Sequence, residues 1–141
     1  MDINLNNHPV WDEFDKIFTQ IDVKALVKEH LESCNYKVKG YWDGDEFYEE
    51  IAFISPLRAE LADCSLGKTN TDCHSHRWMR LQFVLISDTP TSDREQANDY
   101  EEICELTLVL DADWKIIDEN WLIDVESPFV VSRKNVEVQK V

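Results

Sequence analysis

The chain has 141 residues, a length that predicts one domain covering residues 1–141. Its 29 Asp and Glu against 14 Lys and Arg give a formal net charge of −15, which excludes non-specific nucleic-acid binding because a phosphate backbone would be repelled. The charge also argues against anionic membranes, and no apolar run reaches the roughly 20 residues that span a bilayer.

The amino terminus is polar and has neither the basic n-region nor the apolar h-region of an export signal, so we expect a cytoplasmic protein. In a reducing cytoplasm the four cysteines would remain free thiols. Four cysteines allow three pairings, and the sequence does not choose among them. The residues are Cys34, Cys64, Cys73 and Cys104.

Two helices are predicted near the amino terminus. Apolar residues recur at helical spacing from Trp11 to Ile21, and the pattern then changes phase. Asp22 is typical of a residue that ends one helix and caps the next, which runs through Ala25 and Leu26. Both helices could then face one core.

The middle of the chain predicts a short strand from Cys34 to Lys39, a turn around Gly44, and a third helix. Asp45 would cap that helix, and Phe47, Ile51 and Ile54 would share one face of it. Loop-forming residues dominate positions 63–75, so a loop is expected there.

Alternation of apolar and polar residues predicts strands in the second half of the chain. One strand begins at His76, with Met79, Leu81, Phe83 and Leu85 on one face. Residues 88–102 are polar and acidic and predict a mobile loop. Two further runs, 106–110 and 117–125, are joined by the turn 111–113 and predict an antiparallel hairpin. A short strand at 129–131 would follow, and then a tail or edge strand.

This order of elements resembles the nuclear transport factor 2-like superfamily, which includes the SnoaL-like proteins. The similarity rests on the segments 22–26, 44–51 and 111–121, with Trp114 at the position of a turn glycine. From the residues we expect an α+β fold with N-terminal helices packed on a curved antiparallel sheet. The resemblance implies that the sheet is cone-like, as in a cystatin-like α+β barrel. It also implies a dimer, because members of the superfamily are often dimeric.

Some polar residues fit a catalytic or a metal-binding interpretation, and each has a plainer alternative. Under the catalytic alternative, Asp124 and His76 would handle protons in a cone-shaped pocket, in an isomerase-like or hydrolase-like enzyme or carrier. A polar outer sheet face, solvated or dimer-forming, is the commoner arrangement. Cys64, Cys73, His74 and His76 are ligand types that zinc prefers, but their spacing matches no usual site, so no metal or cofactor is predicted.

Two tryptophans and two groups of acids are candidates for binding a partner. Trp42 and Trp114 lie in predicted turns beside carboxylates and would serve as protein anchors; folding back as a lid on the core is an equal alternative. The acids could resemble the phosphates of nucleic acid, although a solvated acidic surface is the commoner arrangement. The binding candidates beside the tryptophans are Asp43, Asp45, Glu46, Glu49, Asp93, Glu95, Asp99, Glu101 and Glu102.

The charge, together with the lack of nucleophile-elbow and phosphate-loop motifs, favours a non-catalytic function. We expect an acidic protein that binds a basic, nucleic-acid-associated protein and can inhibit it, as an inhibitor or immunity-type protein does. The small-molecule enzyme or carrier is the alternative, and a homodimer through the sheet is a third.

Overall fold

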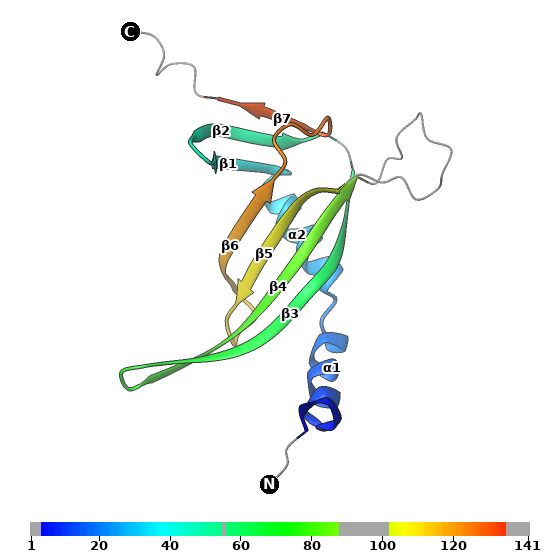
Figure 1. Ribbon diagram of the computed structural model, residues 1–141, viewed down its shortest axis with the longest axis vertical. Helices are drawn as coiled ribbons and strands as arrows, with labels where there is room; N and C mark the ends of the chain where they lie inside the picture. The colour runs from blue at the N-terminus through cyan, green and yellow to red at the C-terminus, as the bar shows by residue number, and fades with distance from the viewer. Residues whose placement is uncertain (1–3, 55, 88–101, 135–141) are drawn as a thin grey trace, which may run out of the picture.

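The computed structural model describes residues 4–54, 56–87 and 102–134. Two helices precede seven strands in the described residues, and the fold is α+β with more strand than helix (Figure 1). The elements are the 3-10 turn η1 (Leu5–Asn7), helices α1 (Val10–Gln20) and α2 (Val23–Ser33), and strands β1 (Lys37–Asp43), β2 (Glu46–Phe53), β3 (Leu57–Thr71), β4 (His74–Ser87), β5 (Glu102–Leu110), β6 (Ile116–Ile123) and β7 (Val130–Arg133).

The predicted break between the two helices is confirmed. Asp22 is the N-cap of α2, and its side chain accepts a hydrogen bond of 3.0 Å from the backbone N–H of Ala25. Such a bond satisfies one of the free N–H groups at a helix start. The bend at Asp22 lets apolar residues of both helices, such as Phe18 and Leu31, pack against the same core.

The strands form two antiparallel sheets, ordered β1-β2-β7 and β3-β4-β5-β6. The predicted hairpin at the carboxyl end is confirmed as β5 and β6, which pair from Cys104 with Ile123 to Leu110 with Ile116. In Figure 1 helix α2 lies behind the four-stranded sheet, α1 continues below it, and the three-stranded sheet lies above it. The cone that the resemblance implies is not seen, because neither sheet closes within the described part of the chain.

The expected third helix is wrong, because its residues form strand β2. Phe47, Ile51 and Ile54 fit helical spacing, but the chain instead turns at Gly44, whose φ of +60° suits glycine, and pairs back on β1. Asp-Gly between two strand-like runs is a hairpin signal. Tertiary packing decides between the two patterns, since Ile51 and Phe53 are buried in the core.

The expected loop at 63–75 is also wrong, because these residues belong to the long hairpin of β3 and β4. The two strands pair from Leu57 with Ser87 to Thr71 with His74, and only Asp72 and Cys73 form the turn. The outer half of this hairpin extends beyond the rest of the sheet (Figure 1). We call residues 66–78 the arm. The mobile loop expected at 88–102 and the tail after Lys134 fall almost wholly outside the described residues.

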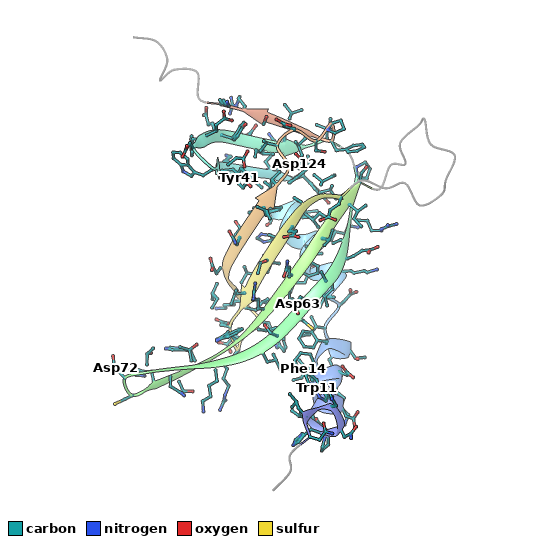
Figure 2. The ribbon with its side chains drawn as sticks, viewed as in Figure 1. Trp11, Phe14, Tyr41, Asp63, Asp72 and Asp124 are labelled. Carbon is teal, nitrogen blue, oxygen red and sulfur yellow. The ribbon has the colours of Figure 1, made fainter. Side chains whose placement is uncertain are left out.

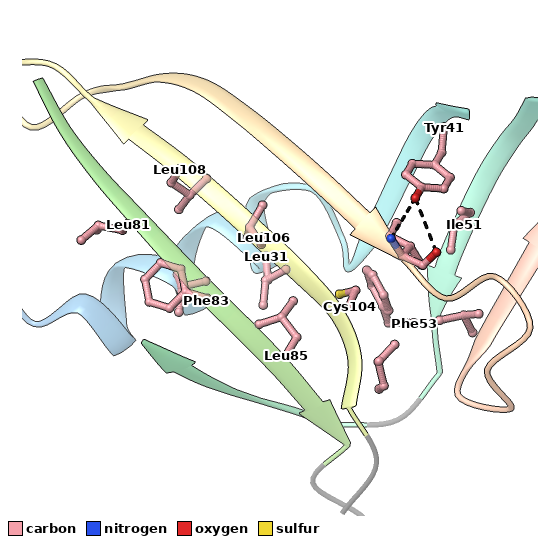
Figure 3. Close-up of a cluster of buried hydrophobic side chains, with 14 of the residues drawn as sticks. Leu31, Tyr41, Ile51, Phe53, Leu81, Phe83, Leu85, Cys104, Leu106 and Leu108 are labelled. Carbon is pink, nitrogen blue, oxygen red and sulfur yellow. Dashed lines mark hydrogen bonds between the residues drawn. The ribbon is translucent and has the colours of Figure 1, made fainter. Parts of the chain in front are cut away.

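The core lies between the four-stranded sheet and the helices. Its centre is the predicted alternating face of β4 with the inward residues of β5, and α2 contributes Val27 and Leu31 (Figure 3). The fully buried apolar side chains of β4 and β5 are Leu81, Phe83, Leu85, Ile103, Leu106, Leu108 and Leu110. No helix among the described residues is long and apolar enough to cross a membrane.

The two sheets meet at the carboxyl end of β6. The hydroxyl of Tyr41 on β1 accepts a hydrogen bond of 2.8 Å from the backbone N–H of Ile123 and donates one of 3.4 Å to its carbonyl (Figure 3). Nearby, the rings of Phe53 and Trp121 stack with centroids 5.7 Å apart. These contacts fix the β1–β2 hairpin against the larger sheet.

Candidate functional site

The end of the β1–β2 hairpin carries an exposed aromatic pair. Trp42 and Phe47 are directly opposite each other in the ladder, and their ring centroids lie 4.9 Å apart. The exposed fraction is 63% for Trp42 and 37% for Phe47. Aromatic rings of this kind bring large contact area at little entropic cost, which is why they anchor protein interfaces.

Carboxylates surround this aromatic pair. Asp43 and Asp45 flank the turn glycine, and neither carboxylate has an ion-pair partner among the described residues, whose ion pairs at this tip are made by Glu46 and Glu49. Glu46 and Glu49 differ, since Lys134 lies 3.3 Å from Glu46. Arg133 lies 3.8 Å from Glu49. We call residues 42–49 the acidic tip.

Two cations, Arg133 at the end of β7 and Lys134 directly after it, neutralise part of the charge that the sequence leads one to expect at the tip, and we call them the β7 cations. Glu46 also accepts a hydrogen bond of 3.0 Å from the Tyr48 hydroxyl, and Lys134 lies 5.3 Å from the centre of the Tyr48 ring. The hydrogen bond and Lys134 lower the pKa of Glu46, and the same hydrogen bond raises the pKa of Tyr48. Glu46 therefore stays ionised, and Lys134 neutralises part of its charge. The negative charge that remains at the tip lies on Asp43 and Asp45.

Trp114 lies in the β5–β6 turn, 50% exposed, and is distant from the acidic tip. Its φ of +66° is in the left-handed region that favours glycine. The carboxylate of Asp111 holds the turn by accepting hydrogen bonds from the N–H groups of Asp113 and Lys115. Trp114 lies just before the first residue of β6. Tyr41, the neighbour of Trp42, contacts Ile123 at the last residue of β6. Trp42 and Trp114 are therefore separated by about the length of β6, roughly 23 Å at ~3.3 Å per residue.

The second group of predicted acids lies mostly outside the described residues, namely Asp93, Glu95, Asp99 and Glu101. Glu102 is described as the exposed first residue of β5. It lies at the opposite end of β5 from the turn that holds Trp114.

The structure does not bring together the pair named in the catalytic alternative. Asp124 follows β6, and its backbone N–H donates to the carbonyl of Ile103. Leu85 of β4 pairs with Cys104, the neighbour of Ile103, and so marks the level of Asp124 on β4. His76 lies on the arm, nine residues along β4 from Leu85. That spacing is about 30 Å at ~3.3 Å per residue. Figure 2 shows Asp124 and the arm residue Asp72 at opposite ends of the molecule.

A groove of about 720 Å³ lies between β1 and β6, and neither Asp124 nor His76 lines it. Its lining includes Lys37, Lys39, Glu50, Glu119 and Trp121. Lys37 lies 3.9 Å from Glu50, and His30 of α2 reaches Glu119 at 2.5 Å, so the charged groups here largely pair with one another. Neither residue of the catalytic alternative therefore lies in this groove, and the acid–base pair that does lie at it is Glu119 with His30.

The four candidate metal ligands are likewise dispersed. Cys64 lies in the middle of β3 on the face that meets the helices, whereas Cys73 lies in the exposed turn of the arm. His74 and His76 do point to one side of β4, as their spacing predicts, with ring centroids 6.4 Å apart. Within the described part of the chain, no three potential ligand side chains gather at one point.

The four cysteines are free thiols in very different surroundings. Cys104 is buried in β5, and burial, with the negative charges of Glu102 and Glu105, raises its pKa from 9.0 to about 12. At pH 8 such a rise lowers the reactive thiolate fraction about a thousandfold. Cys73 is exposed at the end of the arm.

We therefore expect Ellman's reagent at pH 8 to modify Cys73 rapidly and Cys104 only after unfolding. The half-buried Cys34 and Cys64 would react at intermediate rates. Mass spectrometry of the labelled peptides would assign each thiol, and a Cys73→Ser variant would lose the fast phase. Rapid labelling of Cys104 in the folded protein would contradict this arrangement.

Sequence reasoning named Trp42 but missed its ring partner and the β7 cations. Phe47 was assigned to a helix face, whereas Arg133 and Lys134 were assigned to a tail or edge strand. The Asp-Gly turn between two strand-like runs was the signal that would have placed Phe47 opposite Trp42. No local signal places β7 beside β2, because that pairing joins segments about 80 residues apart.

Comparisons with protein-family models, with curated proteins and with solved structures found no match to the chain. The similarity to the nuclear transport factor 2-like superfamily therefore stays a prediction.

Proposed function

We propose that this protein is a non-catalytic acidic protein that binds, and thereby inhibits, a basic nucleic-acid-associated protein through the acidic tip. The observation that carries this proposal is the exposed Trp42–Phe47 pair beside the carboxylates of Asp43 and Asp45, which have no ion-pair partner among the residues that the structure describes. Apolar anchors surrounded by charge are the usual composition of an interface centre and its rim.

The chemistry of the tip fits a cationic surface. An arginine or lysine of the partner can lie over the indole of Trp42, where the ring attracts a cation, while its charge faces Asp43 or Asp45. The net charge of −15 adds long-range attraction and speeds the encounter. A protein whose basic surface normally holds nucleic acid would then be blocked by occupation of that surface.

The double variant Trp42→Ala/Phe47→Ala is expected to weaken partner binding about tenfold, because it removes the apolar anchor and leaves the charge. The protein would be immobilised, exposed to lysate of its source cells at low and at high salt, and the captured proteins identified. Affinity for a captured basic protein would then be measured by calorimetry.

Trp114→Ala is the matched control, since Trp114 is exposed to a similar degree but lies at the other end of β6. Capture should weaken as salt rises, because screening acts on exposed charges, and a DNA duplex should compete with the protein. Binding that is indifferent to salt, or equally reduced by the Trp114 and tip variants, would count against the proposal.

The outward face of the four-stranded sheet stays a candidate for self-association. It carries Arg80, Gln82 and Asn120, as the polar alternation predicts, and also half-buried apolar residues such as Val84. Sedimentation at micromolar concentration would decide whether the chain pairs through this face, and a monomer there would exclude it.

A further inference from the structure

A second surface, distinct from the acidic tip, lies where the arm leaves the sheet. The pairing of β5 with β4 begins at Leu110, which lies opposite Met79, and runs from there to Glu102 opposite Ile86. From His74 to Trp78, β4 pairs with β3 alone, so the other edge of this stretch has no strand beside it in the described residues. Unpaired strand edges are sites where a further strand can add.

A cavity of about 520 Å³ lies at this same place. It begins along β4 from Ser75 to Trp78 and ends at the β5–β6 turn, where Asp111 and Asp113 lie. Its apolar lining is Trp78, Val109, Ala112 and Ile117, and Ile117 is 59% exposed. The free edge and the apolar hollow therefore coincide, and each is a separate indication of a bound segment.

Trp78 is held in place before any segment binds. Its indole N–H donates a hydrogen bond of 3.0 Å to the hydroxyl of Thr69. The ring lies so close to Gly67 that a Cβ added there would be 1.9 Å from the indole. Gly67 is thus the residue that allows the indole to lie flat on β3, which makes Trp78 a preorganised wall of the hollow.

The arm carries a charge opposite to that of the whole protein, while the β5–β6 turn at the far side of the hollow adds the carboxylates of Asp111 and Asp113. Residues 66–80 contain three cations and one carboxylate, whereas the whole chain has 14 and 29. These residues are Lys68, Arg77, Arg80 and Asp72. Arg77 lies opposite Lys68 in the ladder, one position along from Gly67 opposite Trp78. Successive side chains point to opposite faces of a sheet, so Lys68 and Arg77 project from the face opposite the indole of Trp78.

We propose that the free edge of β4 binds an extended peptide segment of a partner in which apolar and acidic residues alternate. Its backbone would continue the sheet in line with β5, beside residues 74–78. Because side chains alternate across a strand, its apolar residues would meet Trp78 and Ile117 while its carboxylates would face Arg77. This site does not depend on the acidic tip, and its occupant has the opposite charge preference.

The probe is a fluorescein-labelled, blocked peptide of alternating valine and glutamate, titrated with the full chain and followed by fluorescence anisotropy. We expect saturable binding and about tenfold weaker binding to Arg77→Glu. The matching valine–lysine peptide can bind the acidic tip, so its occupation of residues 75–78 is judged by hydrogen exchange, and we expect none there. Arg133→Glu on β7 is the control and should bind the probe unchanged. Methylation of alternate amide nitrogens of the probe should abolish binding, because it removes the ladder donors.

Hydrogen exchange reports on the backbone directly. Amide exchange within residues 75–78 should slow when the probe binds, while exchange in the acidic tip should stay as it was. Slower exchange within residues 75–78 in the presence of the valine–lysine peptide, an affinity for the valine–glutamate probe that Arg77→Glu leaves unchanged, or exchange along β4 that this probe does not alter would each overturn the proposal. Because the tip variants are not used, these outcomes are separate from those that test the proposed function.

Discussion

Replacing Phe83 by alanine is expected to lower the free energy of unfolding by about 3–5 kcal/mol, the range for a large aromatic side chain removed from a packed core. Phe83 is fully buried at the centre of β4, between β3 and β5 and beneath the helices (Figure 3). The loss combines the transfer of the ring to water with the cavity that remains. Urea unfolding followed by circular dichroism would measure it.

Val84→Ala is the matched control on the next residue of the same strand. Val84 points to the outward face and is only half-buried, so its truncation should cost about 1 kcal/mol or less. A small loss at Val84 beside a large loss at Phe83 agrees with a sheet that buries the Phe83 face beneath the helices, although part of the difference reflects the larger group removed from Phe83. Similar losses for both would contradict the assignment of the core to the helix side.

Tyr41→Phe is expected to lower the free energy of unfolding by about 1–3 kcal/mol, because it leaves the buried N–H of Ile123 without its acceptor. The same hydroxyl is the contact that ties β1 to the end of β6, so we also expect faster amide exchange in β1 and β2 than in β4 and β5. Urea unfolding and hydrogen exchange would measure the two effects.

Tyr48→Phe is the matched control, since it removes a hydroxyl that reaches an exposed carboxylate, Glu46, and not a buried backbone group. Its cost should be small, because water can replace the lost partner of Glu46. If the two variants lose the same stability, the Tyr41 hydroxyl does not carry the connection between the sheets.

The sequence by itself determined the elements whose pattern carries one buried face. Leucines and Phe83 alternate along β4 and β5, and a single register puts all of them inside. Likewise, the change of phase after Ile21, with Asp22 as cap, was enough to place two helices and the bend between them. In these segments local propensity and tertiary burial agree, so the local pattern is sufficient.

Only the tertiary structure decided the two regions that carry the proposed sites. Most residues of the arm are exposed, so apolar and polar residues do not alternate along it in the pattern that predicts a strand. The arm is a strand because β3 pairs with β4. In β2, Phe47 and Ile51 fit a helix as well as a strand, and pairing with β1 and β7 selects the strand. The acidic tip arises from the β1–β2 hairpin, which the Asp-Gly turn signals, together with the pairing of β7 with β2, which local spacing does not encode. The free edge of β4 arises because β5 pairs with β4 only as far as Met79.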